Sequence, residues 1–324
     1  MHSISELKQL VDKAIAELIF NAGPKDLYDP INYMLSLDAK RLRPVLVLCA
    51  SEMFNGDLKK SMNPALGIEV FHNFTLLHDD IMDNAPLRRT QQTVHSKWNV
   101  NVAILSGDTM FVKACQLMMM TDDDKVRPVM ELFHQTAIEV CEGQQLDMDF
   151  ENLETVLIGD YIHMITSKTA VLLGSSLQTG AILASAPDSD AKHVYEFGKN
   201  IGIAFQLKDD ILDVFANDKK FGKQKGGDIV ANKKTFLLLK ALELASGDDS
   251  SELKKWIQDG NQQPEAKVEA VTKLYQKLNV KELAEAEMDK YFESAMHHLN
   301  EVNVPDERKS ALKDFATQLM KREN

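Results

Sequence analysis

The amino-acid sequence predicts an all-helical fold, and three observations support this prediction. Glycine and proline are scarce, at 15 and 9 of 324 residues, which is few for a chain of many strands and turns. Apolar residues recur at a spacing near 3.6, whereas the alternating runs typical of β-strands are rare. No Asn-Gly or Asp-Gly pair joins two alternating runs. With 44% hydrophobic residues the chain can bury a large core, and we predict a single helical domain over residues 1–324.

Composition also narrows the class of function. A formal net charge of -12 disfavours a nucleic-acid binder, which needs a basic face. The three cysteines are odd in number and lack metal-ligand spacing, so we expect reduced thiols in helices of a cytoplasmic protein. Residues 1–10 do not resemble a signal peptide, and no apolar run approaches the roughly 20 residues of a membrane span. We therefore predict no transmembrane segment.

A basic cluster is the first informative element along the chain. Lys40, Arg41 and Arg43 precede a helix that begins near Pro44. Arginine suits bidentate contacts with phosphate and lysine supplies a point charge, but such clusters are also common as solvated surface patches. His72 follows in an apolar helical stretch, where it is either a core histidine or a ligand.

Two segments of the form Asp-Asp-x-x-Asp come next, at Asp79 to Asp83 and at Asp209 to Asp213. On a helix the first and last aspartates of each segment lie one turn apart on the same face, where they repel each other. Apolar neighbours increase that cost, since they disfavour charged carboxylates. One such segment is usually a solvated helix face, but two among apolar residues indicate bound cations. Hard oxygen ligands beside phosphate suit Mg²⁺.

The remaining elements complete the helical prediction. Asp122 to Asp124 reads as a solvated loop at a helix start. Good helix formers predict a helix over residues 237–245, and an apolar stripe over residues 283–295 predicts a helix facing the core. Residues 248–263 are polar with little periodicity and are predicted to form a surface excursion. Loops are expected at residues 55–57 and 226–228.

The combined motifs resemble those of the trans-isoprenyl diphosphate synthases. They are Lys-Arg-Leu-Arg-Pro at 40–44, the first aspartates within 69–83, Pro-Leu-Arg-Arg at 86–89, Lys-Thr at 168–169, and the second aspartates within 202–213. The match runs from about residue 38 to residue 237. The resemblance implies a helical bundle around a deep central cavity, of the isoprenoid synthase type, and a homodimer. It also implies an Mg²⁺-dependent prenyltransferase, using three ions, that condenses isopentenyl diphosphate with a C5 to C15 allylic diphosphate and releases diphosphate.

The resemblance implies roles for individual residues. Isopentenyl diphosphate would contact Lys40, Arg43, His72 and Arg89. The allylic diphosphate would contact Arg88, Lys168, Thr169, Gln206, Lys223 and Lys233, of which Arg88, Lys168, Thr169 and Gln206 would serve catalysis. Metal ions would bind Asp79, Asp83 and Asp209, with Asp80, Asp210 and Asp213 acting through waters or as hydrogen-bond partners. Two positions depart from the family pattern: Asp38-Ala39 replaces Gly-Gly, and Thr90 replaces a glycine.

Product length is the finest prediction that the resemblance supports. In the family an aromatic residue five positions before the first aspartate restricts the product, and Phe74 occupies that position beside the small Thr75. Helical phase places Thr75 and Phe71 on the aspartate face and Phe74 about 140° away, so geometry alone does not select Phe74. An ordinary core or interface position is the alternative for Phe74. We expect a short product, with C20 favoured over C15.

Three alternatives differ in class or product. A longer-chain polyprenyl diphosphate synthase is the alternative within the family, and Phe74 disfavours it. A terpene cyclase is expected to replace the second aspartate motif with an Asn/Ser/Glu triad and to lack the Lys40, Arg43 and His72 set. A non-catalytic subunit of a heteromeric synthase usually loses aspartates, and none is lost here.

Overall fold

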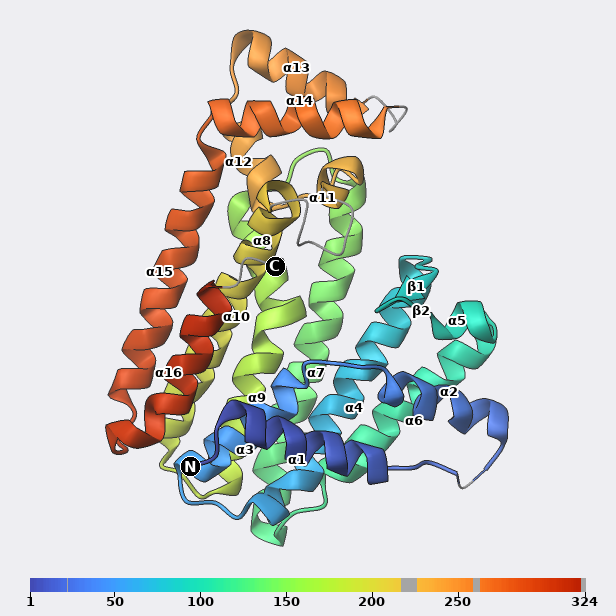
Figure 1. Cartoon of the computed structure of the whole chain (residues 1–324), viewed down its shortest axis with the longest axis vertical. Coiled ribbons are helices and arrows are strands. Elements are labelled where there is room, and N and C mark those ends of the chain that lie inside the picture. Colours follow the sequence, from blue (N-terminus) through green and yellow to red (C-terminus); the bar gives the residue numbers. More distant parts are fainter. Residues whose placement is uncertain (22, 217–225, 259–262, 322–324) are drawn as a thin grey trace. The chain divides into compact units, whose positions relative to one another are not determined.

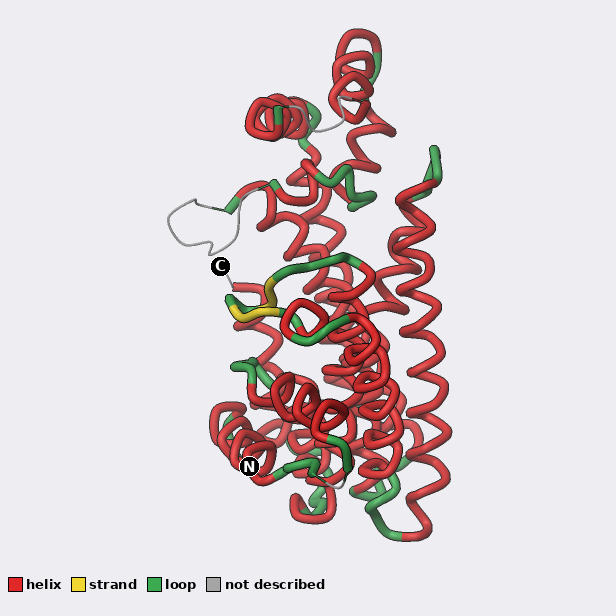
Figure 2. The backbone as a smooth tube through the Cα atoms, turned by 90° about the vertical axis from the view of Figure 1, so that its right-hand side faces the viewer, coloured by secondary structure: helices red, strands yellow, loops and turns green. Residues whose placement is uncertain are grey.

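The computed structural model describes residues 1–21, 23–216, 226–258 and 263–321, and helices form most of this part of the chain (Figures 1 and 2). The α-helices are α1 Ile4–Glu17, α2 Lys25–Ser36, α3 Leu42–Met53, α4 Leu58–Met82, α5 Val94–Lys97, α6 Val100–Met118, α7 Asp123–Asn152, α8 Ile158–Ile165, α9 Val171–Leu183, α10 Asp188–Phe215, α11 Gly227–Val230, α12 Phe236–Leu244, α13 Gly247–Gln258, α14 Pro264–Lys277, α15 Val280–Glu301 and α16 Asp306–Lys321. A π-helix, η1, spans Thr166–Ala170. Two short strands, β1 Leu87–Arg88 and β2 Gln91–Gln92, pair antiparallel. The all-helical prediction is confirmed.

The chain divides into two compact units. Unit 1 comprises residues 1–135, 175–195 and 302–312, and unit 2 comprises residues 136–174, 196–301 and 313–324. Helices α7, α9, α10 and α16 contribute residues to both. The expectation of one domain over residues 1–324 remains a prediction.

Unit 1 is built on α4, which packs beside α3 and α6 (Figure 1). The Asp57 carboxylate caps the start of α4 by accepting a hydrogen bond from the Lys59 N–H at 2.9 Å. From Ala65 to Phe71 every residue of α4 is buried, which explains why this stretch is apolar on all faces except at Glu69. A rigid central helix therefore carries both His72 and the first aspartate motif.

Unit 2 has its own apolar core, formed by side chains of α8, α10, α12, α13, α14 and α15. Tyr161 of α8, Leu207 of α10 and Tyr275 of α14 are among its buried members. The second aspartate motif lies on the part of α10 that belongs to this unit. The apolar residues between its aspartates, such as Ile211, are anchored in this core.

Most predicted helices are present, with two corrections. Residues 237–244 lie in α12, and α15 covers 283–295, where Met288 and Ala295 of the predicted stripe are buried. Leu283 at its start is exposed, and Ala284 is buried instead. The predicted surface excursion at 248–263 was wrong in part, because residues 248–258 form most of α13. Leu253 of α13 is fully buried, so packing of a few apolar residues overrides the weak helical pattern.

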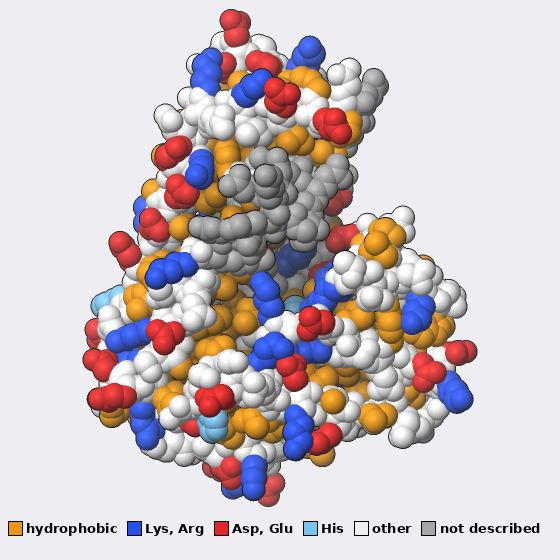
Figure 3. Space-filling view, viewed as in Figure 1, with side chains coloured by type: hydrophobic (Ala, Val, Ile, Leu, Met, Phe, Trp, Pro, Cys, Tyr) orange, Lys and Arg blue, Asp and Glu red, His pale blue; other side chains and the backbone are white. Residues whose placement is uncertain are grey.

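The structure also tests several smaller predictions. α7 begins at Asp123, as predicted for the acidic run. The expected loop at 226–228 is shorter than predicted, because α11 begins at Gly227. Cys49, Cys115 and Cys141 are free thiols in helices, as predicted. No helix among the described residues is long and apolar enough to cross a membrane. Both acidic and basic side chains spread over the face drawn in Figure 3, which is typical of solvated helices.

Candidate active site

The first aspartate motif lies at the C-terminal end of α4, in unit 1. Asp79 is half-buried and Asp83, which caps the helix, is exposed. The last carbonyls of a helix carry partial negative charge, so carboxylates at this end raise the electrostatic energy. No basic residue lies in the last turn of α4 to offset them. The donor set and its charge fit a divalent cation with hard oxygen ligands.

The middle aspartate of this motif has a protein partner. Asp80 is 2% exposed, and both of its oxygens accept hydrogen bonds from the Arg88 Nε at 2.9 Å. Arg88 Nη2 lies 2.8 Å from the same carboxylate. Because a buried carboxylate needs such a partner, Asp80 is held in place by Arg88, which was predicted to contact the allylic diphosphate.

A tight hairpin positions Arg88 and Arg89. The two residues between β1 and β2, Arg89 and Thr90, have φ of 52° and 67°. Positive φ at both positions is the geometry of a type I′ turn, which favours glycine or asparagine. Thr90, which stands where the family has glycine, therefore keeps the turn at a steric cost for a β-branched residue. Asp38 and Ala39 do not have positive φ, so their backbone does not require glycine.

A set of positive charges surrounds His72, also in unit 1. The Arg43 Nη1 lies 3.0 Å from His72 Nε2. Burial, followed by the charges of Arg43, Arg89, Arg88 and Arg41, holds the pKa of His72 well below its usual range. The imidazole is therefore neutral and accepts from Arg43.

Arg41 and Arg88 of this set pair with carboxylates, whereas Arg43 lies beside the neutral His72. Burial lowers the pKa of Arg43 to about 10, and Arg43 Nε has no hydrogen-bond partner among the described residues. Burial and the Arg41 charge also lower the pKa of Arg89. Lys40 is exposed at the edge of this region of the chain. A buried guanidinium with an unbonded Nε, close to other positive charges, fits an anion with several oxygens, such as a diphosphate.

Arg41 differs from its basic neighbours. Its guanidinium is buried, 2.7 Å from Glu69 Oε1, and donates to the carbonyls of Leu35 and Leu37 at 2.6 and 3.0 Å. Glu69 also accepts from the Asn73 amide at 3.0 Å. Arg41 itself has a φ of 50° and precedes α3. Arg41 therefore secures the loop that carries Lys40 and leads into α3, where Arg43 lies.

Four phenylalanines cluster beside the first motif. The ring centroid of Phe74 lies 5.7 Å from that of Phe71 and 5.5 Å from that of Phe111 of α6. Phe133 of α7 lies 5.2 Å from Phe71 and 6.3 Å from Phe111. Thr75 bonds its hydroxyl to the His72 carbonyl at 2.8 Å. Phe74 is thus part of an aromatic layer that contains residues of three helices.

The second aspartate motif, in unit 2, repeats the pattern of the first. Asp209 and Asp213 are half-buried, whereas Asp210 is 5% exposed. Asp210 accepts hydrogen bonds from the Tyr161 hydroxyl and from the Gln206 amide, the latter at 3.1 Å. Burial, and then the charge of Asp228, raise the pKa of Asp210 to about 7. As in the first motif, the middle aspartate is engaged by protein donors.

Asp213 is held by the backbone of a following turn. Its carbonyl accepts from the Gly226 N–H at 2.8 Å, and its carboxylate accepts from the Asp228 N–H at 3.1 Å. Lys233 ends the same turn through a hydrogen bond from its N–H to the Asp228 carbonyl at 2.9 Å. The Lys233 charge partly opposes the rise in the pKa of Asp210, so this predicted lysine lies near the motif. Lys223 lies outside the described residues.

Lys168 and Thr169 lie in the π-helix η1, a local widening that is frequent at functional sites. Lys168 Nζ donates to Asp147 of α7 at 2.5 Å. A side chain at Gly143 would come within 2.2 Å of the Lys168 backbone nitrogen, and one at Gly202 within 2.6 Å of the Ala170 Cα. Both glycines therefore let neighbouring helices approach η1 closely. This close packing fixes the backbone position from which the Lys168 side chain extends.

The structure adds residues that sequence reasoning missed. Three of these residues contact predicted site residues. Asp147 bonds to Lys168, and Tyr161 bonds to Asp210. The Asp228 N–H bonds to Asp213, and Glu69 pairs with Arg41 of the basic cluster. Glu69 carried a usable signal, since a lone acid in a fully apolar helical stretch needs a cation. Tyr161 and Asp228 had none. Across the described ranges, no three His, Cys, Asp or Glu side chains gather closely enough to hold a metal ion by themselves.

Comparison with known proteins identifies the family of the chain. The model of the polyprenyl synthetase family matches residues 24–275, most of the chain. The chain belongs to the polyprenyl synthetase family. It is thus a trans-prenyltransferase of the short-chain type, as its motifs predicted.

Individual relatives agree with that placement. A geranylgeranyl diphosphate synthase from Methanosarcina mazei is 40% identical over 235 residues, which is 72% of each chain. A crystal structure of a geranylgeranyl pyrophosphate synthase superposes with a TM-score of 0.95 at 41% identity, covering 100% of both chains. A polyprenyl synthase from Caulobacter crescentus, 25% identical with a TM-score of 0.86 over 99% of this chain and 98% of its own, was solved with calcium and isoprenyl diphosphate. These relatives share the all-helical isoprenoid synthase fold, and the family uses divalent metal.

Proposed function

We propose that this synthase condenses isopentenyl diphosphate with C5 to C15 allylic diphosphates and releases a C20 product, geranylgeranyl diphosphate. One observation carries the proposal. Within unit 1, α4 holds an acidic end at Asp79 and Asp83 and, two turns earlier, a neutral histidine among arginines. A diphosphate can bind the first through cations and the second through guanidinium groups directly. One chain then offers two chemically distinct diphosphate sites.

Isopentenyl diphosphate would occupy the basic set of Lys40, Arg43, His72 and Arg89. Arg43 supplies buried donors, one of which lacks a partner, and His72 stays neutral and orients Arg43. Arg41 does not contact the substrate and stiffens the loop. Such fixed donors hold the diphosphate with little loss of side-chain entropy, so the double bond is presented in a constant position.

Magnesium, as three ions, would bind through Asp79 and Asp83 of the first motif and Asp209 of the second. When bound, Mg²⁺ stabilises the negative charge that develops on the departing diphosphate. Asp80 and Asp210 act differently, since Arg88 and Tyr161 already hold them. Held in this way, Asp80 and Asp210 would orient the other aspartates of each motif.

The allylic diphosphate would contact Arg88, Lys168 and Lys233, with Lys223 as a further expected contact. The Thr169 hydroxyl and the Gln206 amide are oxygen dipoles suited to the allylic cation left by ionisation. Isopentenyl diphosphate attacks this cation, a carbon–carbon bond forms, and the released diphosphate accepts the proton lost from the isopentenyl carbon. Positioning and electrostatics supply the catalysis.

The finer features of the enzyme also belong to this proposal. The aromatic layer around Phe74 would stop chain growth at C20. A homodimer would cover exposed apolar residues of α6, which include Ile104, Leu105 and Val112 at 40, 59 and 55% exposure. The free thiols suit a cytoplasmic enzyme.

Purified protein with Mg²⁺ and labelled isopentenyl diphosphate tests the proposal. Separate reactions contain the C5, C10 or C15 allylic diphosphate, and products are sized by chromatography. We expect one series ending at C20, abolished by EDTA. A series that continues beyond C25 would indicate a longer-chain synthase. No turnover by the chain alone would reject an active synthase and would favour a subunit that needs a partner.

A further inference from the structure

Lys267, on α14 in unit 2, is a buried lysine that no predicted role explains. Its side chain is 1% exposed, and its Nζ donates to the Val230 carbonyl at 3.2 Å. Burying an ammonium group is costly, so a lysine in this position needs interactions that stabilise its charge. Val230 is the last residue of α11, in the turn that holds Asp213.

That turn, which we call the α11 turn (residues 226–233), is internally braced. The Val230 N–H donates to the Gly226 carbonyl at 3.0 Å, and the Lys233 N–H donates to the Asp228 carbonyl at 2.9 Å. These short-range bonds tie the residues of the turn to one another. A displacement of Val230 would therefore also displace the Asp228 N–H, which donates to the Asp213 carboxylate.

A second contact shows that α14 supports this turn. Gly226 has a φ of 75°, and a Cβ there would lie 2.7 Å from both methyl groups of Val268. Val268 follows Lys267 on α14, so two consecutive residues of α14 meet opposite ends of α11. Only glycine satisfies both the backbone angle and the close approach.

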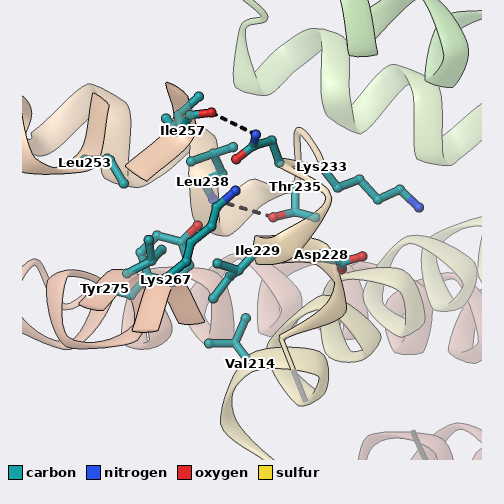
Figure 4. A pocket seen from close by; sticks show the side chains of 12 residues that line it. Val214, Asp228, Ile229, Lys233, Thr235, Leu238, Leu253, Ile257, Lys267 and Tyr275 are labelled. Atoms are coloured by element: carbon teal, nitrogen blue, oxygen red, sulfur yellow. Dashed lines mark hydrogen bonds between the residues drawn. The ribbon is translucent and has the colours of Figure 1, made fainter. Parts of the chain in front are cut away.

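The surroundings of Lys267 indicate a support and not a ligand site. A cavity of about 10 Å³ lies between α11, α13 and α14, and in Figure 4 Lys267 and Tyr275 lie on one side of it, Asp228 and Lys233 on the other. This volume holds about one water molecule. Burial, and then the charge of Asp228, raises the pKa of Tyr275, so the carboxylate lies near this ring.

We propose that Lys267 is a positioning residue for the second aspartate motif, because it holds the α11 turn against α14 and so keeps the Asp228 N–H on the Asp213 carboxylate. The proposal rests on the function proposed above, in which this motif binds Mg²⁺ with the allylic diphosphate. Lys267 does not contact substrate or metal. Its effect reaches the motif through the backbone of the turn.

The test compares Lys267→Met with Lys273→Met in the full-length protein. Lys273 lies on the same helix, is 69% exposed and pairs at the surface with Glu269 at 2.6 Å, a kind of contact that contributes little to stability. For Lys267→Met we expect the Mg²⁺ concentration for half-maximal activity to rise about tenfold, the equivalent of one lost hydrogen bond of about 1.4 kcal/mol. The rate at saturating Mg²⁺ is expected to stay near the wild-type value, and Lys273→Met to match the wild type throughout. A merely structural role would instead lower the rate at every Mg²⁺ concentration.

A measurement independent of activity keeps the proposal testable if the protein shows no prenyl transfer. Amide hydrogen exchange over residues 226–230 should accelerate in Lys267→Met and not in Lys273→Met. Mg²⁺ with inorganic diphosphate should also raise the melting temperature less in Lys267→Met than in the wild type. No turnover by the wild type would reject the proposed function, whereas unchanged exchange in Lys267→Met would overturn the role of Lys267.

Two further outcomes are decisive. Faster exchange without a change in Mg²⁺ dependence would overturn the link from Lys267 to Asp213. If Lys267→Met fails to fold, Gly226→Ala displaces the same turn from Val268 without removing a charge. Gly226→Ala should then show the same rise in half-saturating Mg²⁺, and a wild-type value would overturn the proposal.

Discussion

The buried ion pair between Arg41 and Glu69 permits a sharp prediction about stability. In Arg41→Met the Glu69 carboxylate, 2% exposed, loses its guanidinium partner at 2.7 Å, and the Leu35 and Leu37 carbonyls lose a donor. Removing one partner of a buried pair leaves an uncompensated charge and costs about 3–5 kcal/mol. The Asn73 amide still donates to Glu69 and limits the loss. We therefore expect the free energy of unfolding to fall by about 3 kcal/mol.

The double variant Arg41→Met/Glu69→Leu separates charge from packing. Replacing both partners by apolar residues removes the buried charge, so about 2 kcal/mol of the loss should be recovered. The remainder is the cost of the two carbonyls that Arg41 served. Arg127→Met is the matched control, because Arg127 is 88% exposed and pairs with Glu131 on the surface of α7. Such surface pairs contribute little, so no resolvable change is expected.

Urea unfolding followed by circular dichroism at pH 7 measures all four proteins. In the single variant that remains folded, the KM for isopentenyl diphosphate should rise more than kcat falls, since the loop that carries Lys40 and leads to Arg43 of α3 loses its anchor. A loss for Arg41→Met no larger than that for Arg127→Met would refute the reasoning. So would a double variant that is no more stable than the single one.

Three other predictions follow from the same structure. Phe74→Ala should lengthen the product by at least one C5 unit, and Phe111→Ala should do the same because its ring lies 5.5 Å from Phe74; chromatography of the products decides. In EDTA, stability should fall as pH rises from about 4 to 7, because Asp210 with a pKa raised to about 7 binds a proton that the unfolded chain has already lost. Asp210→Asn should remove up to about 4 kcal/mol of this pH dependence, measured by urea unfolding across the range. Thr90→Gly should raise the unfolding free energy by about 0.5–1 kcal/mol in thermal melts, since the left-handed backbone at 67° is strained for threonine.

Each of these has a contrary result. An unchanged product from both phenylalanine variants would remove the aromatic layer as the limit of chain growth, and Phe292→Ala on α15 controls for general loss of packing. Parallel pH curves for Asp210→Asn and the wild type would contradict a protonated Asp210. A less stable Thr90→Gly would mean that the threonine hydroxyl, which bonds to the Arg89 carbonyl at 2.6 Å, outweighs the strain.

The two aspartate motifs were predictable because their signal is local. Spacing along a helix and the character of adjacent residues are properties of a few consecutive positions. The structure places both motifs on helices, and the family comparison agrees with the reaction class that they indicated. The ligand roles of the individual residues remain predictions.

The basic cluster shows where local information ends. Arg41 and Arg43 are two positions apart and chemically identical, yet Arg41 is committed to Glu69 and Arg43 faces His72. The left-handed backbone at Arg41 turns its side chain inward. Nothing in the adjacent sequence predicts this positive φ. Likewise α13 was missed, because its helical state depends on burying Leu253 against a core formed elsewhere in the chain.

By itself the sequence determined the helical class, the positions of the aspartates and basic residues, and the family's chemistry. Tertiary structure decided which of those residues are supports. Arg41 and Glu69 are 28 positions apart, Tyr161 and Asp210 are 49 apart, and Lys267 and Val230 are 37 apart. Helical periodicity reaches only three or four residues along the chain, whereas these partners meet because separate helices pack together. A buried charge is stable only where such packing brings it a partner, and so the roles of Arg41, Asp210 and Lys267 became visible only in the folded chain.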